Sequence, residues 1–411
     1  MLRGCTRLFS LDQRLTQLGS RLAAGLSHGE LYGLTEEFFA DPTVLTDDPR
    51  VVLSHKNTLV ELHAKFGHHS KQLLTGVVQP LVLRTAALPD LQLRDALQVV
   101  RLGLLLPVLA EGKIVKEALR VVIREVQRVK EPLDQYTVAD LYSIQRQSRV
   151  VSYELVSALE TQVLNNHNSL LSAAHTLALP QLYAYLGLSL DRLRPQLLNT
   201  IRNEASSYSD ACFLALLKSL AMVEEFTPQL WQDTLFPRLQ SMKTHHLNKE
   251  LLADLGLVVL VLEVLAPGLK ETPYMKSQAY KELSAGALSV RRASLETAPK
   301  PSSQLLDEIA KSLREAKENF SQYYLTPKPY CMLVEVFKEP TTVIKPLVSA
   351  EMLYDSYQPL GTTRLHLRLL RKLGYQVIEV SWADWVQIPR KKTPGQLTRL
   401  LKLAQEKAGR S

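Results

Sequence analysis

The chain has 411 residues, of which 46% are hydrophobic, 22% are charged and 7% are aromatic. This ordinary globular composition is enough for two domains or one elongated solenoid, and it excludes a long low-complexity region. Plentiful leucine with few aromatic residues favours helices over sheets. Three widely separated cysteines without a CxxC pair exclude a secreted disulfide framework and a clustered zinc site.

The formal charge of +8 lies mainly at the two ends of the chain. Residues 328–411 contain 14 lysines and arginines against 7 acidic residues, and residues 1–21 contain four arginines against one aspartate. The long middle part is therefore close to neutral. A basic excess confined to one region is typical of a protein that binds an anionic partner such as RNA, although a charged surface that only keeps the protein in solution would have the same composition.

Residues 1–26, MLRGCTRLFSLDQRLTQLGSRLAAGL, combine spaced arginines, leucine and serine with a single acid. At helical spacing the leucines form one stripe, and Arg7, Arg14 and Arg21 lie off it. This pattern predicts a mitochondrial targeting segment and a location in the mitochondrial matrix, while an ordinary amphipathic first helix of the body is the alternative. No apolar run is long enough to cross a bilayer, so no membrane partner is expected.

Residues 27–265 form leucine-rich stretches separated by proline and glycine, which predicts a helical body. Four stretches align as helix pairs, and the second helices of these pairs repeat at spacings of 37, 38 and 38 residues. The anchor positions of that alignment are Val126, Val163, Ile201 and Leu239. A period of about 38 predicts an α-solenoid of two-helix repeats, because such units bury their apolar faces only by stacking. An irregular α-bundle with coincidental spacing is the alternative.

Residues 266–327 are expected to form a linker and a polar helix, SSQLLDEIAKSLREAKENF, capped by Ser302 or Ser303. After Pro329 the pattern changes to a short strand, YCMLVEVF, a helix from Thr362 that ends before Gly374, a second strand, YQVIEVSW, and a last helix near residues 394–408. Residues 328–411 therefore predict a small module of helices and strands that follows an all-helical body.

This module resembles a RAP domain. The words that carry the resemblance are YCMLVEVF, TRLHLRLLRKLGYQVIEVSWADW and LTRLLKLAQEK, and the run LLRKLGYQVIEVSWADW is the most specific of them. The resemblance implies a small α/β domain of restriction-endonuclease-like fold. RAP domains follow helical bodies in organellar RNA-processing and ribosome-associated proteins, including relatives of the FAST-kinase family. The expected protein is thus mainly α, with an α-solenoid followed by this domain.

The resemblance implies a non-catalytic RNA-binding protein of the mitochondrion. Its RNA would be ribosomal RNA or an organellar transcript, and its other partners would be ribosomal or RNA-processing proteins. We expect it to act in RNA maturation or stability, or as a component of the mitochondrial ribosome. A protein-interaction scaffold is an alternative. No cofactor and no metal are expected.

The helix after Thr362 carries a cationic stripe. At 100° per residue, four basic residues fall within about a third of its circumference, which suits contacts with phosphates. These are Arg364, Arg368, Arg371 and Lys372. Arg390, Lys391 and Lys392 follow the last strand and could extend the stripe, and Trp382 and Trp385 could stack on bases, with one of them expected in the core. A merely solvated basic face is the alternative.

The second alternative is a metal-dependent ribonuclease, because the implied fold is that of restriction endonucleases. Such chemistry needs clustered carboxylates and a nearby lysine. Glu335 and Lys338 are spaced Glu-x-x-Lys, which places them on opposite faces of a strand, and Glu379 and Asp384 complete no recognisable constellation. No Walker loop, GxSxG, HExxH, dinucleotide or kinase motif occurs, so an enzyme is not expected.

Overall fold

The computed structural model describes residues 10–40, 46–106, 112–128, 133, 135–148, 152–165, 173–242, 247–338, 340–348, 351–353 and 358–386. The chain divides into two compact units. The first comprises residues 1–148 and 152–166, and the second comprises residues 149–151 and 167–411.

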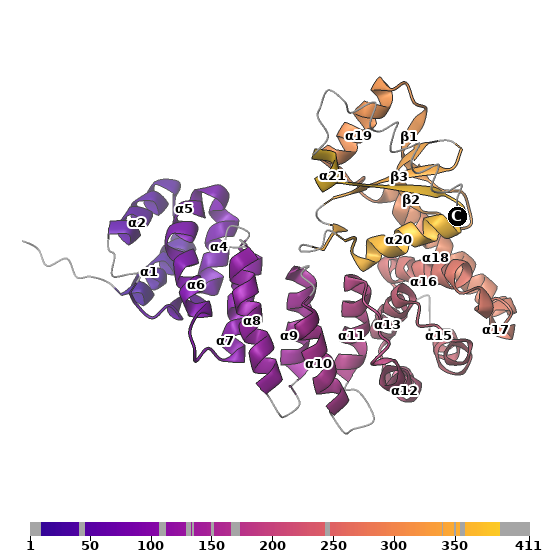
Figure 1. Ribbon diagram of the computed structural model, residues 1–411, viewed down its shortest axis with the longest axis horizontal. Helices are drawn as coiled ribbons and strands as arrows, with labels where there is room; N and C mark the ends of the chain where they lie inside the picture. Colours follow the sequence, from indigo (N-terminus) through magenta and orange to yellow (C-terminus); the bar gives the residue numbers. More distant parts are fainter. Residues whose placement is uncertain are drawn as a thin grey trace, which may run out of the picture. The chain divides into compact units, whose positions relative to one another are not determined.

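The described part of the first unit is helical (Figure 1). Its elements are α1 (Leu11–Ala24), α2 (His28–Ala40), α3 (Val51–Ser54), α4 (Lys56–Phe66), the short helix η2 (Gly67–Ser70), α5 (Lys71–Leu73), the π-helical turn η3 (Leu74–Val78), α6 (Gln79–Ala86), α7 (Leu93–Leu105), α8 (Gly112–Arg128), α9 (Gln135–Ser148) and α10 (Tyr153–Asn165). Helix α7 packs against α8 and α9, and α8 packs against α10. The first expected helix pair, α7 with α8, is therefore packed together, and α9 and α10 follow as consecutive helices.

The leucine stripe of the N-terminal segment is buried. Helix α1 begins with a capping box, in which Ser10 and Gln13 bond to each other's backbone N–H, and it ends at Gly25 with φ +98°. Leu11, Leu15 and Leu18 are almost inaccessible and α1 packs on α4. The described part of this segment, from Ser10 on, thus forms the first helix of the unit, as the alternative to a targeting role expected, and targeting stays a prediction.

The second unit begins with two further expected pairs, α11 (Ala173–Leu186) with α12 (Arg194–Glu204), and α13 (Asp210–Val223) with the helical run α14 (Pro228–Leu230), η6 (Trp231–Leu235) and α15 (Phe236–Ser241). These are followed by α16 (Lys249–Leu265), α17 (Pro273–Lys276), α18 (Gln278–Thr297) and α19 (Gln304–Glu315). The predicted mainly helical architecture is confirmed, and a regular repeat of about 38 residues stays a prediction.

A four-stranded sheet follows, in the order β1 (Phe320–Leu325), β2 (Leu333–Lys338), β3 (Thr342–Leu347) and β4 (Gln376–Ser381). β1, β2 and β3 are antiparallel neighbours, whereas β4 runs parallel to β3 and is reached through α20 (Gly361–Lys372). The short helix α21 (Trp382–Val386) follows β4. A parallel pair needs such a crossover connection, which explains the helix between the two strands.

Two helices cover opposite faces of this sheet (Figure 1). Ser303 caps α19, as expected, and the apolar face of α19 forms a core with the sheet and α21. That core contains Leu305, Leu306, Ile309, Leu313, Val336, Ile344, Ile378, Val380 and Trp385. Helix α20 contacts β4 on one side and α11, α13 and α16 on the other. The leucines of α20 are therefore buried on two sides, between the sheet and the helices.

The strands span a longer stretch of the chain than expected, and there are more of them among the described residues. β1 lies at Phe320–Leu325, in the segment expected to be linker and helix, and β3 was not predicted at all. β3 contains Pro346, a residue that argues against an interior strand. The β2–β3 pairs end at Ile344, however, so the missing N–H of Pro346 removes no bond of that ladder.

Candidate nucleic-acid interface

Helix α20 carries the four cations predicted to bind phosphates, and the structure places them in different surroundings. Arg364 and Arg368 reach residues of the helical part of the unit, on which α20 packs through α11, α13 and α16, but Arg368 stays 44% exposed. Arg371 and Lys372 lie in the last turn, where the helix dipole favours positive charge.

Arg364 is half-buried and holds α20 to the loop after α11. Its Nε donates to the carbonyl of Pro359 at 2.9 Å, its Nη1 donates to the carbonyl of Gly187 at 3.3 Å, and its Nη2 donates to Oε1 of Gln358. All three acceptors are neutral. Within the described residues Arg364 has no carboxylate partner, so its positive charge is positioned but not balanced.

The other three cations differ in how they are paired. Arg368 forms an ion pair with Glu224 at the end of α13, and Arg371 forms one with Glu379 on β4. Both arginine side chains are about half exposed, at 44% and 50%. Lys372 is exposed and makes no ion pair with the part of the chain that the structure describes. The cations therefore lie on one helix, where Arg364 is half-buried and the other three are exposed to solvent.

The remaining predicted residues fall in three classes. Arg390, Lys391 and Lys392 lie outside the described residues. Trp382 is half-buried against the sheet core. Trp385 is 2% exposed, and its indole Nε1 donates to Glu308 at 2.5 Å. As a core residue, Trp385 offers no ring face to a base, which corrects its inclusion among the RNA contacts.

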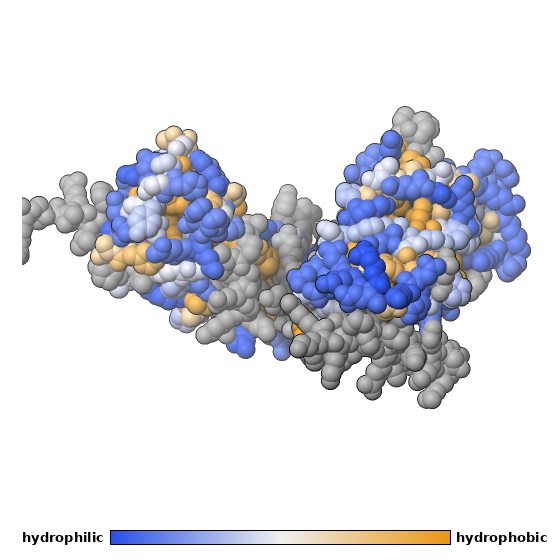
Figure 2. All heavy atoms as spheres, turned by 90° about the horizontal axis from the view of Figure 1, so that it is seen from above, coloured by the Kyte–Doolittle hydropathy of each residue, from blue (hydrophilic) through white to orange (hydrophobic). Residues whose placement is uncertain are grey.

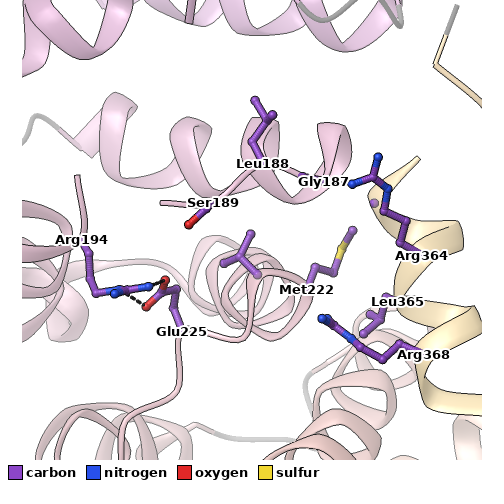
Figure 3. A pocket seen from close by; sticks show the side chains of 11 residues that line it. Gly187, Leu188, Ser189, Arg194, Met222, Glu225, Arg364, Leu365 and Arg368 are labelled. Atoms are coloured by element: carbon purple, nitrogen blue, oxygen red, sulfur yellow. Dashed lines mark hydrogen bonds and ion pairs between the residues drawn. The ribbon is translucent and has the colours of Figure 1, made fainter. Parts of the chain in front are cut away.

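A pocket of about 270 Å³ lies beside the N-terminal half of α20 (Figure 3). Its lining includes Gly187, Ser189, Arg194, Glu225, Arg364 and Arg368. Gly361, the first residue of α20, also lines it and lies so close to the backbone of Ala184 that a Cβ atom would overlap the carbonyl oxygen. The pocket thus joins the helical part of the second unit to the first turns of α20. No feature of the local sequence pattern indicated it.

A second group of charged residues lies between the sheet and the helices. Lys345 on β3 is 4% exposed and donates to Glu335 of β2 and, at 2.7 Å, to Oε1 of Glu351. Burial alone would lower the pKa of Lys345, but the two carboxylates outweigh it and keep the pKa above its ordinary value. The spacing of the sequence set Glu335 beside Lys338, whereas Glu335 forms its ion pair with Lys345 on the neighbouring strand β3. The β-branched run before Lys345 was the signal that could have located this strand.

His366 of α20 is close to this group. Burial, and then the charges of Lys345 and Arg291, lower its pKa to about 3. Its buried Nε2 and the Oε2 atom of Glu335 find no hydrogen-bond partner in the described parts of the chain. The imidazole is therefore neutral at physiological pH.

The carboxylates considered for a nuclease are held by cations. Glu335 pairs with Lys345, Glu379 pairs with Arg371, and Lys338 pairs with Glu318 at 2.7 Å. Among the described residues, no three histidine, cysteine or acidic side chains are grouped as metal ligands. The side chain of Asp384 is not among the described ones. The Lys345 ammonium group pairs with both Glu335 and Glu351.

The face of the molecule in Figure 2 is largely hydrophilic, with scattered apolar patches. Over the residues that the structure covers, no helix combines the length and the apolar character that a bilayer crossing requires.

Comparison with protein families identifies the C-terminal module. The family model of the RAP domain matches residues 351–396, which begin just after β3 and include α20, β4 and α21. The resemblance of this module to a RAP domain is thereby confirmed. No curated protein matches the chain.

The chain is a RAP-domain protein with a mainly helical body. RAP domains are generally associated with RNA binding.

Proposed function

We propose that this protein is a non-catalytic RNA-binding protein of the mitochondrion. It acts in the maturation or stability of organellar transcripts, or it binds ribosomal RNA as a component of the mitochondrial ribosome. The RAP domain is the observation that carries this proposal. The basic excess of residues 328–411 and the arginine-rich amphipathic segment at residues 1–26 support the RNA partner and the location, respectively.

The absence of catalysis is part of the proposal. Phosphodiester hydrolysis by a metal mechanism needs carboxylates that are free to hold the ion. Lys345 binds Glu335 and Glu351, and the resulting triad has the form of a structural ion cluster. The RNA is then bound for protection or presentation, and other ribosomal or RNA-processing proteins supply any chemistry.

Cross-linking in isolated mitochondria tests whether RNA is the partner. Tagged full-length protein is cross-linked to RNA by ultraviolet light in isolated mitochondria, and the bound RNA is sequenced. We expect mitochondrial transcripts or ribosomal RNA to be enriched over a tag-only control. Recovery of proteins without RNA would contradict the proposal and would favour a protein-interaction scaffold.

The exposed end of α20 gives a matched test with purified protein. Replacing Arg371 and Lys372 with glutamine should weaken binding to single-stranded RNA and reduce the slope of log K against log salt by about 0.7 for each lost phosphate contact. The control replaces Lys276 and Lys281, which are basic residues of α17 and α18, with glutamine. Equal effects of the two double variants would show that only net charge matters.

A further inference from the structure

The pocket beside α20 collects three arginine side chains from two directions. Figure 3 shows Arg364 and Arg368 reaching from α20 on one side, and Arg194 with Glu225 on the other. Met222 and Leu365 supply apolar surface between them. The pocket is therefore a small cavity with a basic rim, and its charge balance decides what it can bind.

Arg194 is neutralised inside the protein. Its Nε and Nη2 each donate to one oxygen of Glu225 at 2.7 Å, and its Nη2 also donates to Asp191 at 2.8 Å. The side chain of Glu225 is only 7% exposed. This two-pronged pair with a buried carboxylate is the strong form of an arginine ion pair, so Arg194 stays in place and contributes little net charge.

Arg368 is paired in a weaker way. Its partner Glu224 is 37% exposed, and Arg368 itself is 44% exposed. Ion pairs at such exposed positions contribute little, because water and salt screen them. Arg368 can therefore exchange Glu224 for another anion at low cost.

Arg364 keeps an unbalanced charge. Three neutral oxygens fix its guanidinium, and two of its five N–H groups remain for other acceptors. A partly buried charge is normally paired with an opposite charge. The positive end of the α20 dipole at Gly361 adds to the same potential.

We propose that this pocket binds a phosphate group of an RNA strand, with Arg364 as the fixed cation and Arg368 as the mobile one. Arg368 leaves Glu224 and forms a second fork on the phosphate, so that Glu224 acts as a built-in competitor of the RNA. This inference rests on the proposed function and assigns part of the RNA site to the junction of α20 with α11 and α13. Planar guanidinium forks match phosphate oxygens, which favours phosphate over other anions.

Because Glu224 and the RNA compete for Arg368, removing Glu224 and removing Arg368 should change the affinity for RNA in opposite directions. Binding of a labelled single-stranded RNA to the full chain is followed by fluorescence anisotropy over a range of salt. Glu224→Gln should raise the affinity roughly two- to fivefold, because it releases Arg368 from an exposed ion pair. Arg368→Gln should lower the affinity and reduce the salt slope by about 0.7. In the Arg368→Gln background, Glu224→Gln should have no further effect.

A matched control separates the pocket from general charge. Glu271→Gln removes one carboxylate from an exposed pair with Lys276, outside the pocket, and changes the net charge by the same amount. It should alter the affinity less than Glu224→Gln does. Equal gains from the two variants, or a gain from Glu224→Gln that persists without Arg368, would overturn the pocket and leave RNA binding itself intact.

Two further outcomes have distinct meanings. A parent protein that binds no RNA would refute the proposed function. If an oligoglutamate peptide instead binds the parent and shows the same coupling between Glu224 and Arg368, the ligand is an acidic peptide and the phosphate assignment is wrong. Thermal melting of each variant verifies that it is folded, and both side chains are exposed enough for the substitutions to be tolerated.

Discussion

Replacing Gly361 with alanine places a methyl group against the backbone of α11. The new Cβ atom would lie 1.6 Å from the carbonyl oxygen of Ala184 and 2.8 Å from its carbonyl carbon. Both atoms belong to the main chain, so no side-chain rotation relieves the overlap, and α20 must move away from α11. Forcing an additional carbon into a packed contact costs about 1–3 kcal/mol, and backbone partners favour the upper end of that range.

The same substitution at Gly286 should have the opposite sign. Gly286 lies inside α18, and apart from the local backbone of this helix and the two neighbouring residues, no described heavy atom lies within 4 Å of the position that its Cβ would take. An alanine in the interior of an exposed helix stabilises it by roughly 0.5–1 kcal/mol relative to glycine, because the unfolded chain has less freedom to lose. The two variants add the same atom and differ only in what surrounds it.

Thermal melting of the full chain, followed by circular dichroism, measures both effects. For a domain of about 150–250 residues, about 1 kcal/mol of stability corresponds to a shift of about 2–4 °C in Tm. We expect Gly361→Ala to lower the Tm by roughly 2–12 °C and Gly286→Ala to raise it by roughly 1–4 °C. If Gly361→Ala melts at the temperature of the parent or above it, the close contact of α20 with α11 is wrong, and the pocket that depends on it is wrong as well.

Three other predictions concern the buried charges and the N-terminus. The pKa of His366 is lowered from 6.5 to about 3 in the folded chain, so the unfolded chain binds the additional proton first as the pH falls below 6.5, and stability should drop by up to about 2 kcal/mol on reaching about pH 5. Urea unfolding above pH 6.5 and near pH 5 measures this loss of stability, and His366→Leu should remove it. An unchanged pH dependence in that variant would exclude His366 as the cause. Lys345→Met leaves two carboxylates without their shared cation and should cost about 3–5 kcal/mol in urea unfolding, whereas adding Glu335→Gln and Glu351→Gln should recover most of it, and a fully stable single variant would contradict the ion cluster. Residues 1–26 fused to a fluorescent reporter should direct it to mitochondria, and glutamine in place of the arginines should abolish import; a cytosolic parent fusion would argue against the proposed location.

Local sequence patterns were sufficient for the helices and for the family. Leucine spacing and proline breaks are properties of neighbouring residues, and they located the helix pairs from α7 to α15. The run from Thr363 to Trp385 pointed to the RAP domain, since it combines a helix, a glycine turn and a strand in one continuous segment. The capping of α19 by Ser303 was predicted for the same reason, because a cap is decided within four residues.

The surroundings of the cations were decided by tertiary structure alone. A helical wheel correctly places Arg364 and Arg368 on one face of α20, but it cannot tell whether water or another helix covers that face. The carbonyl of Gly187 meets Arg364 across 177 positions of the chain, and Glu335 meets Lys345 only because β2 and β3 are antiparallel in one register. Such contacts depend on how whole elements pack, and a pattern of neighbouring residues carries no information about a partner that far along the chain. The sequence alone therefore determined which residues are basic and on which helix face they lie, whereas the packing of α20 between sheet and helices decided which of them are held inside and which face the solvent.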